Sequence, residues 1–323
     1  MSASAASSWQ SYWQQADDKK VCELGGTDHP AISQFWHRFF SDARLGAKSA
    51  SRKLRIVDIA SGSGAVFEHL FSIVDEECCD SVCVDLSYGA VKAVKNRRRA
   101  VSGVVANGLA LPFTESCADI VVSQFGIEYA GFEAVTGLQS LIRPRGRLAL
   151  LLHHRGGAIY DECYHNYLAL REVQKSGFLQ GAIAMFPHAF SVLKGEERSE
   201  YERVSKGLIP AFRHMERIMA QYGNQVAGGV VRKLYLDVDH IHSNLPAFAL
   251  HEVDAWLRQA VCELESYAER MFSMCQSALD IEQFESLKKE LTSEGFQLYV
   301  AESLNAPDCS APLAWSILAA KEN

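Results

Sequence analysis

Residues 56–65 read Ile-Val-Asp-Ile-Ala-Ser-Gly-Ser-Gly-Ala, an apolar run that ends in a turn with two glycines. The apolar residues suit a buried parallel strand, and apolar residues recur at helical spacing from Val66 onward. Such strand-to-helix turns bind nucleotides in α/β folds, because Gly62 and Gly64 let the backbone bend tightly and a ligand approach closely. The carboxylate of Asp58 can accept hydrogen bonds from an amine or a hydroxyl.

A second strand is predicted at 81–84, and Asp85 follows it about twenty residues after the glycine turn. An acidic residue at this place in a doubly wound sheet can accept both ribose hydroxyls of a nucleoside. Dinucleotide-dependent enzymes share this arrangement with other adenosine-binding proteins. The first two motifs therefore leave the identity of the ligand open.

Three later motifs follow in order. The chain reads Val-Val-Ala-Asn-Gly-Leu-Ala-Leu-Pro-Phe from Val104, Ser-Gln-Phe-Gly at 123–126 after an apolar fourth strand, and Leu-Ile-Arg-Pro-Arg-Gly at 141–146 before a fifth strand at 147–152. With the glycine turn, these motifs resemble class I S-adenosylmethionine-dependent methyltransferases. Within that superfamily they most resemble the small-molecule group that includes the quinone-biosynthesis enzymes. The resemblance implies S-adenosylmethionine as cofactor, S-adenosylhomocysteine as product and a small-molecule methyl acceptor as partner.

The expected fold is α/β, with a doubly wound, Rossmann-like, seven-stranded sheet. A helix at 281–296, with Gly295 as its stop signal, and strands at 297–304 and 313–320 fit the terminal antiparallel hairpin of this superfamily. Between the fifth strand and that helix lies a large helical insertion. The predicted organisation is an N-terminal helical segment covering the cofactor site at 1–52, the cofactor-binding core at 53–154 and 280–323, and an acceptor lid at 155–279.

The insertion reads mostly as helix, with segments at 159–173, at 201–222 with an interruption at Pro210, and at 251–279. The last has apolar residues at the three-and-four spacing of one buried face, which favours packing against neighbouring helices over a cofactor-binding stripe. An insertion at this point would stand over the carboxyl ends of the strands, where open sheets bind ligands.

The resemblance assigns cofactor contacts to matching positions. They are Asp58, Ala60, Ser61, Gly62, Gly64, Asp85, Leu86, Asn107, Gly108, Leu109, Gln124 and Phe125. The glycine turn would contact the methionine moiety, Asp85 the ribose hydroxyls and Asn107 with its two followers the adenine edge, while Gln124 and Phe125 would face the transferable methyl.

Two positions depart from the usual pattern of that superfamily. Ala60 stands where many relatives have glycine, and its extra methyl group should be tolerated if the local φ is negative. Asn107 stands where an aspartate is usual, and it keeps an acceptor oxygen while losing the charge. Neither change argues against cofactor binding.

Methyl transfer from a sulfonium is a direct displacement, so the protein mainly has to align the acceptor and exclude water. A general base helps only when the acceptor must lose a proton. His153 and His154, at the end of the fifth strand, are the candidate catalytic residues, because imidazole titrates near neutrality. Their alternative role is to cap the strand.

Four N-terminal residues, Tyr12, Trp13, His29 and Trp36, either fold over the cofactor, where aromatic faces would attract a sulfonium, or simply pack. The pattern at Asp237, Asp239, His240 and His242 lacks a recognised ligand spacing, and the nine cysteines include no Cys-x-x-Cys pair. We therefore expect no metal site and no disulfide framework.

A formal net charge of −7 argues against nucleic acid as a partner, because phosphate binding uses clustered Lys and Arg. The run Arg97 to Arg99 closes a predicted helix, where it complements the helix dipole. No apolar run is long enough to cross a bilayer, and the N-terminus lacks a signal-peptide pattern, so cytoplasmic residence is expected. The sequence does not decide between a monomer and a homo-oligomer.

Three other functions remain beside methyl transfer. A binding or regulatory subunit on the same fold would hold the cofactor without catalysis. An aminopropyltransferase would need an acidic cluster for a polyamine, which the sequence lacks beyond the motif aspartates. A dinucleotide-dependent dehydrogenase would need the full Gly-x-Gly-x-x-Gly turn, which is incomplete here.

Overall fold

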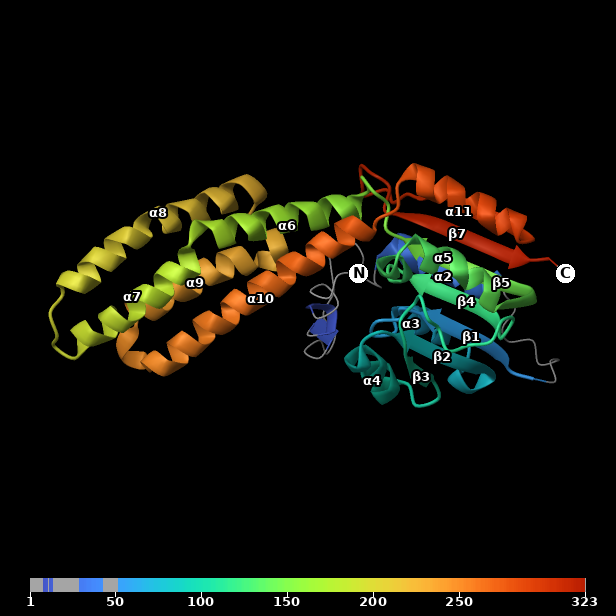
Figure 1. The fold of residues 1–323 in the computed structure, drawn as a ribbon, viewed down its shortest axis with the longest axis horizontal. Helices are drawn as coiled ribbons and strands as arrows, with labels where there is room; N and C mark the ends of the chain where they lie inside the picture. Colours follow the sequence, from blue (N-terminus) through green and yellow to red (C-terminus); the bar gives the residue numbers. More distant parts are fainter. Residues whose placement is uncertain (1–7, 11, 14–28, 43–51, 323) are drawn as a thin grey trace. The chain divides into compact units, whose positions relative to one another are not determined.

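The computed structural model describes residues 8–10, 12–13, 29–42 and 52–322. The rest of the predicted N-terminal segment lies outside the described residues. The chain divides into two compact units, a sheet unit of Met1–Glu162 with Ser273–Asn323 and a helical unit of Cys163–Phe272. Figure 1 shows the sheet in the first unit and long helices in the second.

Within the described residues, seven strands form one sheet in the order β3-β2-β1-β4-β5-β7-β6. The strands are β1 (Leu54–Ile59), β2 (Cys79–Asp85), β3 (Ser102–Val105), β4 (Ala118–Gln124), β5 (Ile142–Leu152), β6 (Phe296–Leu304) and β7 (Ala314–Lys321). The first five strands are parallel, and β7 runs antiparallel to both β5 and β6. The doubly wound sheet with a terminal antiparallel hairpin is confirmed.

The central strands are apolar because helices cover both faces of the sheet (Figure 1). Ile56 and Val57 of β1 are fully buried although successive side chains of a strand point to opposite faces. The edge strand β3 is short and mostly exposed, as edge strands commonly are. Asp58 is thus a carboxyl group within the fully buried end of β1, between Val57 and Ile59.

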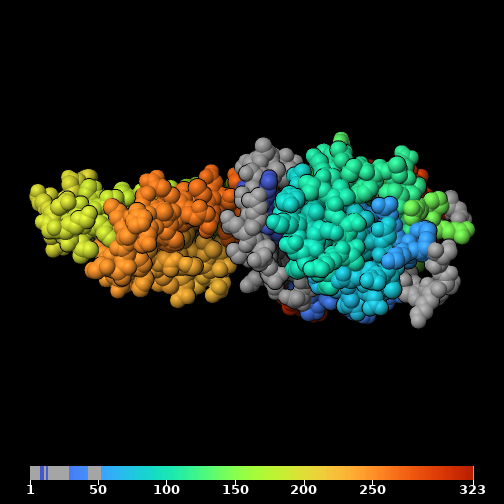
Figure 2. Space-filling model, turned by 90° about the horizontal axis from the view of Figure 1, so that it is seen from below, coloured from blue at the N-terminus to red at the C-terminus, as the bar shows by residue number. Residues whose placement is uncertain are grey.

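The helices of the sheet unit follow the strands in alternation. They are α2 (Pro30–Asp42), α3 (Ala65–Phe71), α4 (Tyr88–Arg97), α5 (Phe132–Gly137) and α11 (Ile281–Ser293), with short 3-10 turns η1 (Glu76–Cys78), η2 (Ile127–Ala130) and η3 (Leu138–Leu141). In Figure 2 the visible face of this unit consists mostly of the chain between β1 and α5.

Helix α11 closes the core on the hairpin side. Asp280 and Gln283 form a reciprocal capping box at its start. Its Phe284 packs in the same apolar cluster as residues of α5 and of the central strands. The predicted end at residue 296 is wrong: the helix stops at Ser293, and Gly295 takes φ +80° so that the chain can turn into β6.

The helical unit is built from α7 (Phe178–Leu193), α8 (Ser199–Tyr222) and α9 (Val230–Ser243), and it shares α6 (Ala158–Ser176) and α10 (Leu250–Ser277) with the sheet unit. Within this unit α7 packs along α8, and α9 contacts both α7 and α8. The interruption predicted at Pro210 is wrong, since α8 is continuous and Pro210 lies on its exposed side.

Two helices of this unit, α7 and α9, were not predicted. In α7 apolar residues occur almost all round, so no polar face marks the helix by its period. None of the helices in the described part of the chain is long and apolar enough to span a membrane.

Candidate active site

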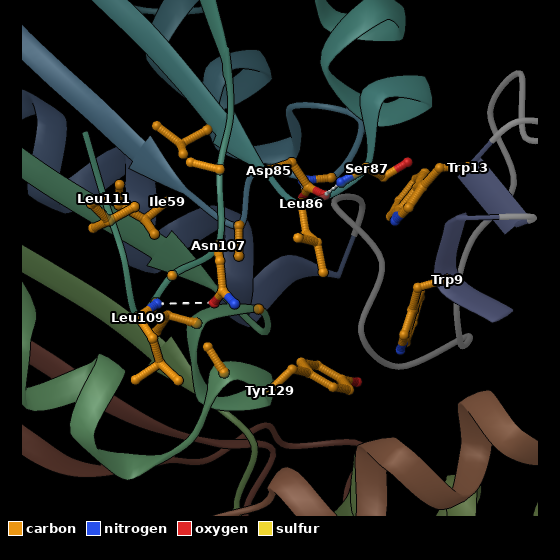
Figure 3. A pocket seen from close by; sticks show the side chains of 18 of the residues that line it. Trp9, Trp13, Ile59, Asp85, Leu86, Ser87, Asn107, Leu109, Leu111 and Tyr129 are labelled. Carbon is orange, nitrogen blue, oxygen red and sulfur yellow. Dashed lines mark hydrogen bonds between the residues drawn. The ribbon is translucent and has the colours of Figure 1, made fainter. Parts of the chain in front are cut away.

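A cavity of about 620 Å³ opens at the carboxyl ends of the central strands of the sheet unit (Figure 3). The predicted cofactor residues on its wall are Ala60, Gly62, Asp85, Leu86, Asn107, Gly108, Leu109 and Phe125. The predicted residues that do not line it are Asp58, Ser61, Gly64 and Gln124. The structure thus brings the turns after β1, β2, β3 and β4 together at one site.

Asp85 joins two of these turns. Its Oδ2 accepts the backbone N–H of Gly62 at 2.9 Å, and its Oδ1 accepts the backbone N–H of Ser87 at 2.8 Å. Burial raises the pKa of this carboxyl group, and the backbone N–H groups at Ser87, Gly62 and Leu86 partly offset that effect. Each carboxylate oxygen keeps a second lone pair, so the side chain can still accept hydroxyl donors.

Asp58 lies behind the glycine turn, at the end of β1. Its side chain is fully buried, and neither carboxyl oxygen has a hydrogen-bond partner among the described residues. Burial, together with the nearby Asp85, holds the pKa of this carboxyl group well above its usual range. A buried polar group without a partner is costly, so Asp58 marks a place suited to a hydrogen-bond donor.

The glycine turn is held in left-handed conformations. Gly62 has φ +51° and Gly64 has φ +87°, which glycine adopts without strain. Ala60 has φ +55°, so the condition under which its methyl group should be tolerated, a negative φ, is not met. A non-glycine residue in this region carries about 1–2 kcal/mol of strain.

Asn107, Gly108 and Leu109 form another wall of the cavity. The side-chain oxygen of Asn107 accepts the backbone N–H of Leu109 at 3.0 Å, which fixes the direction of the amide (Figure 3). Gly108 packs closely on Ile127, because a Cβ there would lie 2.8 Å from the Ile127 side chain. Leu86 and Leu109 are about half exposed at this wall.

The side chains of Gln124 and Phe125, at the end of β4, lie in different surroundings. The indole N–H of Trp36, which is fully buried, donates a hydrogen bond to the side-chain oxygen of Gln124. Gln124 therefore contacts α2 and not the cavity, while Phe125 takes φ +52° and lines the cavity.

Three aromatic residues close the cavity on a further side: Trp9, Trp13 and Tyr129 (Figure 3). The rings of Trp9 and Tyr129 meet edge to face at 5.4 Å, and those of Trp9 and Trp13 stack at 6.3 Å. We refer to these three residues as the aromatic wall. The four N-terminal residues predicted to cover the cofactor or pack have different places: Trp13 is on the wall, Tyr12 packs edge to face on Trp9 and Trp13, Trp36 is in the core and His29 caps α2.

His153 is buried at the end of β5 and held by a carboxylate. Its Nδ1 donates to Oε1 of Glu128 at 2.7 Å, and its backbone N–H donates to the same oxygen at 2.9 Å. Its Nε2 has no hydrogen-bond partner among the described residues. The ring lies behind the cavity wall, 4.8 Å from the ring of Phe125 and 5.7 Å from that of Tyr129.

His154 points elsewhere. Its ring stacks on Trp315 at 3.8 Å, and its Nδ1 donates to the carbonyl of Arg155 at 2.9 Å. Burial lowers the pKa of this imidazole. His154 does not line the cavity, so of the two predicted catalytic histidines only His153 contacts cavity residues.

Glu128 and Trp9 were missed in the sequence. Glu128 sits between Ile127 and Tyr129 directly after Ser-Gln-Phe-Gly, and its side chain is fully buried. A carboxylate between apolar residues, just past the end of a central strand, was the available signal. Trp9 gave none beyond its aromatic character.

No metal site follows from the described side chains. One group of three potential ligands, His29, Asp308 and Cys309, lies in the described part of the chain. The Nδ1 of His29 accepts the backbone N–H of Ala31, so its proton is on Nε2, which faces Asp308 at 3.6 Å. Burial also raises the pKa of the Cys309 thiol, which disfavours the thiolate that binds metals.

The predicted acidic and histidine pattern on α9 does not converge either. Asp237 pairs with Lys233, His242 with the hydroxyl of Tyr201, and His240 with Asn244.

The doubly wound sheet, its antiparallel hairpin and the cavity at the acidic strand ends define a class I S-adenosylmethionine-dependent methyltransferase fold. Residues 57–150 match the family model described as a methyltransferase domain. This match runs from β1 to β5, and for that part of the chain it supports a class I methyltransferase domain with S-adenosylmethionine as cofactor.

Curated relatives carry quinone-biosynthesis names. The chain is 32% identical over 122 residues to the demethylmenaquinone methyltransferase of Beutenbergia cavernae. This match covers 37% of this chain and only 47% of that protein. It is 23% identical over 233 residues to the ubiquinone/menaquinone biosynthesis C-methyltransferase UbiE of Shewanella sp. strain ANA-3, covering 61% of this chain and 91% of the relative. The match to the first relative thus spans less than half of its length.

Among solved structures, the plantazolicin methyltransferase BpumL in complex with SAH is 11% identical with a TM-score of 0.49, covering 99% of this chain and 95% of that chain. The CurJ carbon methyltransferase is 12% identical with a TM-score of 0.45, covering 92% of this chain and 56% of that chain.

The residues at the cavity fit the cofactor. Asp85 and Gly62 line the cavity, where Asp85 offers acceptors for hydroxyl groups and Gly62 has a backbone without a Cβ. Behind this wall, the buried carboxyl group of Asp58 has no hydrogen-bond partner among the described residues. A volume of about 620 Å³ falls within the usual range of ligand sites.

Proposed function

We propose that the protein transfers the methyl group of S-adenosylmethionine to a small-molecule acceptor that loses a proton during the reaction. The observation that carries this proposal is the joining of the β1 and β2 turns by Asp85 on the wall of the 620 Å³ cavity. When bound, the cofactor supplies an electrophilic methyl group. The chain's own residues hold the two reactants in line and exclude water.

The proposed cofactor residues are those of the four turns. Asp85 would accept the ribose hydroxyls, Asn107 to Leu109 would face the adenine, and Asp58 with the glycine turn would hold the methionine end. Phe125 adds an apolar surface. Among the predicted residues that do not line the cavity, Gln124 would act indirectly, since it is bonded to Trp36.

We assign proton removal to His153 rather than to His154. With its proton on Nδ1 and donated to Glu128, His153 has a lone pair on Nε2, which has no hydrogen-bond partner in the part of the chain that the structure describes. Catalytic contacts often tighten only with reactants bound. Two residues of the cavity wall, Phe125 and Tyr129, lie against this ring. The carboxylate of Glu128 stabilises the imidazolium that forms.

The proposed acceptor is a flat, mostly apolar molecule with an acidic O–H or C–H group, such as a phenolic or quinol ring. Support comes from the aromatic and aliphatic lining of the cavity and from the quinone-biosynthesis names of the curated relatives. Loss of a phenolic proton makes both the oxygen and the adjacent ring carbon more nucleophilic. The proposed base therefore suits either position.

The helical insertion belongs to this proposal as the acceptor-binding part. Its support is the point of insertion, directly after the carboxyl end of β5, where open α/β sheets bind ligands. Substitutions in it should change the KM for the acceptor and leave cofactor binding unchanged.

The test begins with calorimetric titration of the purified protein with S-adenosylmethionine and S-adenosylhomocysteine. We expect both to bind, and absence of heat and of a thermal shift with either would overturn the proposal. A screen of phenols, quinols, amines, thiols and carboxylates by mass spectrometry then identifies the acceptor. Binding of the cofactor with methylation of amines or thiols alone would disprove the assigned acceptor class.

A further inference from the structure

The aromatic wall is built from parts of the chain far apart in sequence. Trp9 and Trp13 come from the N-terminus, and Tyr129 comes from η2, after β4. Figure 3 shows both indole rings across the cavity from Asn107 and Leu109. Both tryptophans are only half-buried, and both line the cavity.

Trp13 lies directly on the glycine turn. A Cβ added at Gly62 would come within 2.8 Å of the Trp13 benzene ring, so the indole occupies the space that a larger residue would need. Gly62 is also the residue whose N–H is bonded to Asp85. The indole thus covers the same turn that the proposed function gives to the methionine end of the cofactor.

Trp9 is fixed in place by a polar contact. Its indole N–H donates to the hydroxyl of Ser273 at 3.1 Å, and its ring packs edge to face on Tyr129. Because Trp9 stacks with Trp13 at 6.3 Å, this anchor also positions the ring on Gly62. Packing alone would not require the hydrogen bond that the Trp9 indole makes at this wall.

We propose that Trp13, positioned by Trp9, recognises the positive charge of the bound cofactor through its ring face, so that the protein prefers the charged cofactor over its neutral product. This inference rests on the proposed function. A cation over an indole gains about 0.5–2 kcal/mol, most where water is excluded. Methyl transfer removes the sulfonium charge, so the same contact that favours cofactor binding weakens product binding.

The carboxylates nearby would also attract a cation, so the test must separate them from the ring. We would measure Kd by calorimetry for S-adenosylmethionine, S-adenosylhomocysteine and sinefungin, in which an amine-bearing carbon replaces the methylated sulfur. Trp13→Leu leaves Asp58 and Asp85 in place. It should reduce the preference for the two charged ligands over S-adenosylhomocysteine by about 3–10-fold, equivalent to a loss of about 0.6–1.4 kcal/mol.

Two further variants control for packing. Trp13→Phe keeps an aromatic face and should retain most of the preference, while Tyr299→Leu removes an exposed ring on β6 and should change nothing. A Trp13→Leu variant that loses affinity equally for all three ligands, or keeps the wild-type ratio, would overturn the inference. Wild-type protein that binds none of them would instead refute the proposed function.

Discussion

The Nδ1 of His153 and the Oε1 of Glu128 lie 2.7 Å apart, and that single oxygen also accepts the backbone N–H of His153. The carbonyl of His153 in turn accepts the N–H of Leu279 at 2.9 Å. The end of β5 is therefore bonded both to η2, beside the cavity, and to the segment by which the chain returns from the insertion. The hydrogen bond to Glu128 sets the orientation of the imidazole of His153 and places its proton on Nδ1.

Glu128→Gln should weaken the base without removing its support. The amide oxygen can still accept both N–H groups, but it cannot stabilise an imidazolium as a carboxylate does. We expect kcat to fall about 10–100-fold, because the variant lacks the carboxylate that stabilises the imidazolium formed on proton removal. The Kd for the cofactor should be the same as in the wild type. An unchanged kcat would show that the pair is only structural.

His154→Ala separates the two histidines. Its ring stacks on Trp315, so its loss should lower the free energy of unfolding by about 1 kcal/mol and leave kcat within about threefold. Because burial lowers its pKa in the folded state, the wild type should lose this contribution as the pH falls below about 6.5. A large loss of kcat with normal folding would move the base to His154.

Asp85→Ala should weaken the binding of S-adenosylmethionine and of S-adenosylhomocysteine alike. It removes the proposed acceptor for ribose hydroxyls, which both ligands carry, so we expect each Kd to rise at least about tenfold. The backbone N–H groups of Gly62 and Ser87 also lose their acceptor, so the melting temperature should fall. Asp80→Ala, an exposed carboxylate on the same strand, is the matched control. Selective loss of only one ligand would contradict the assignment.

The fold could be predicted because its signals are local. Each core strand is an apolar run with a polar residue or a glycine turn at its end, and the order of motifs from Asp58 to Gly146 identifies the sheet. The predictions for the start of α11 and for Gly295 also held, since capping and left-handed glycines depend on near neighbours.

What the sequence could not supply depends on contacts between distant residues. Nothing near His153 marks Glu128 as its partner, and the orientation of His154 toward Trp315 depends on the return of the chain at β7. The positive φ of Ala60 is a further case, because the turn is fixed by its bonds to β2 and by contact with Gly126 rather than by the preference of alanine.

Asp119→Asn should lower stability mainly above pH 4. Burial alone would raise the pKa of Asp119, but hydrogen bonds from Arg52, the N–H of Arg55 and Arg143 outweigh it and set the pKa to about 2. A carboxyl group with a depressed folded pKa stabilises above its unfolded pKa, and this contribution is lost as pH falls from about 4 toward about 2. Chemical unfolding at pH 7 should show a loss of about 1–3 kcal/mol. The two proteins should converge only near and below about pH 2, and a difference that stays constant with pH would contradict the assignment.

Ala60→Gly tests the strain in the cofactor turn. At φ +55° alanine carries about 1–2 kcal/mol of strain that glycine lacks, whereas glycine costs about 0.4–1 kcal/mol through the freer unfolded chain. The balance predicts a gain of about 0.5–1 kcal/mol in the free energy of unfolding, measured in urea. Gly126→Ala should act in the opposite sense, because its Cβ would lie 2.6 Å from the Ala60 carbonyl oxygen, a backbone atom that cannot move aside. If Ala60→Gly destabilises instead, the Ala60 methyl group must contribute more by packing than its backbone loses in strain.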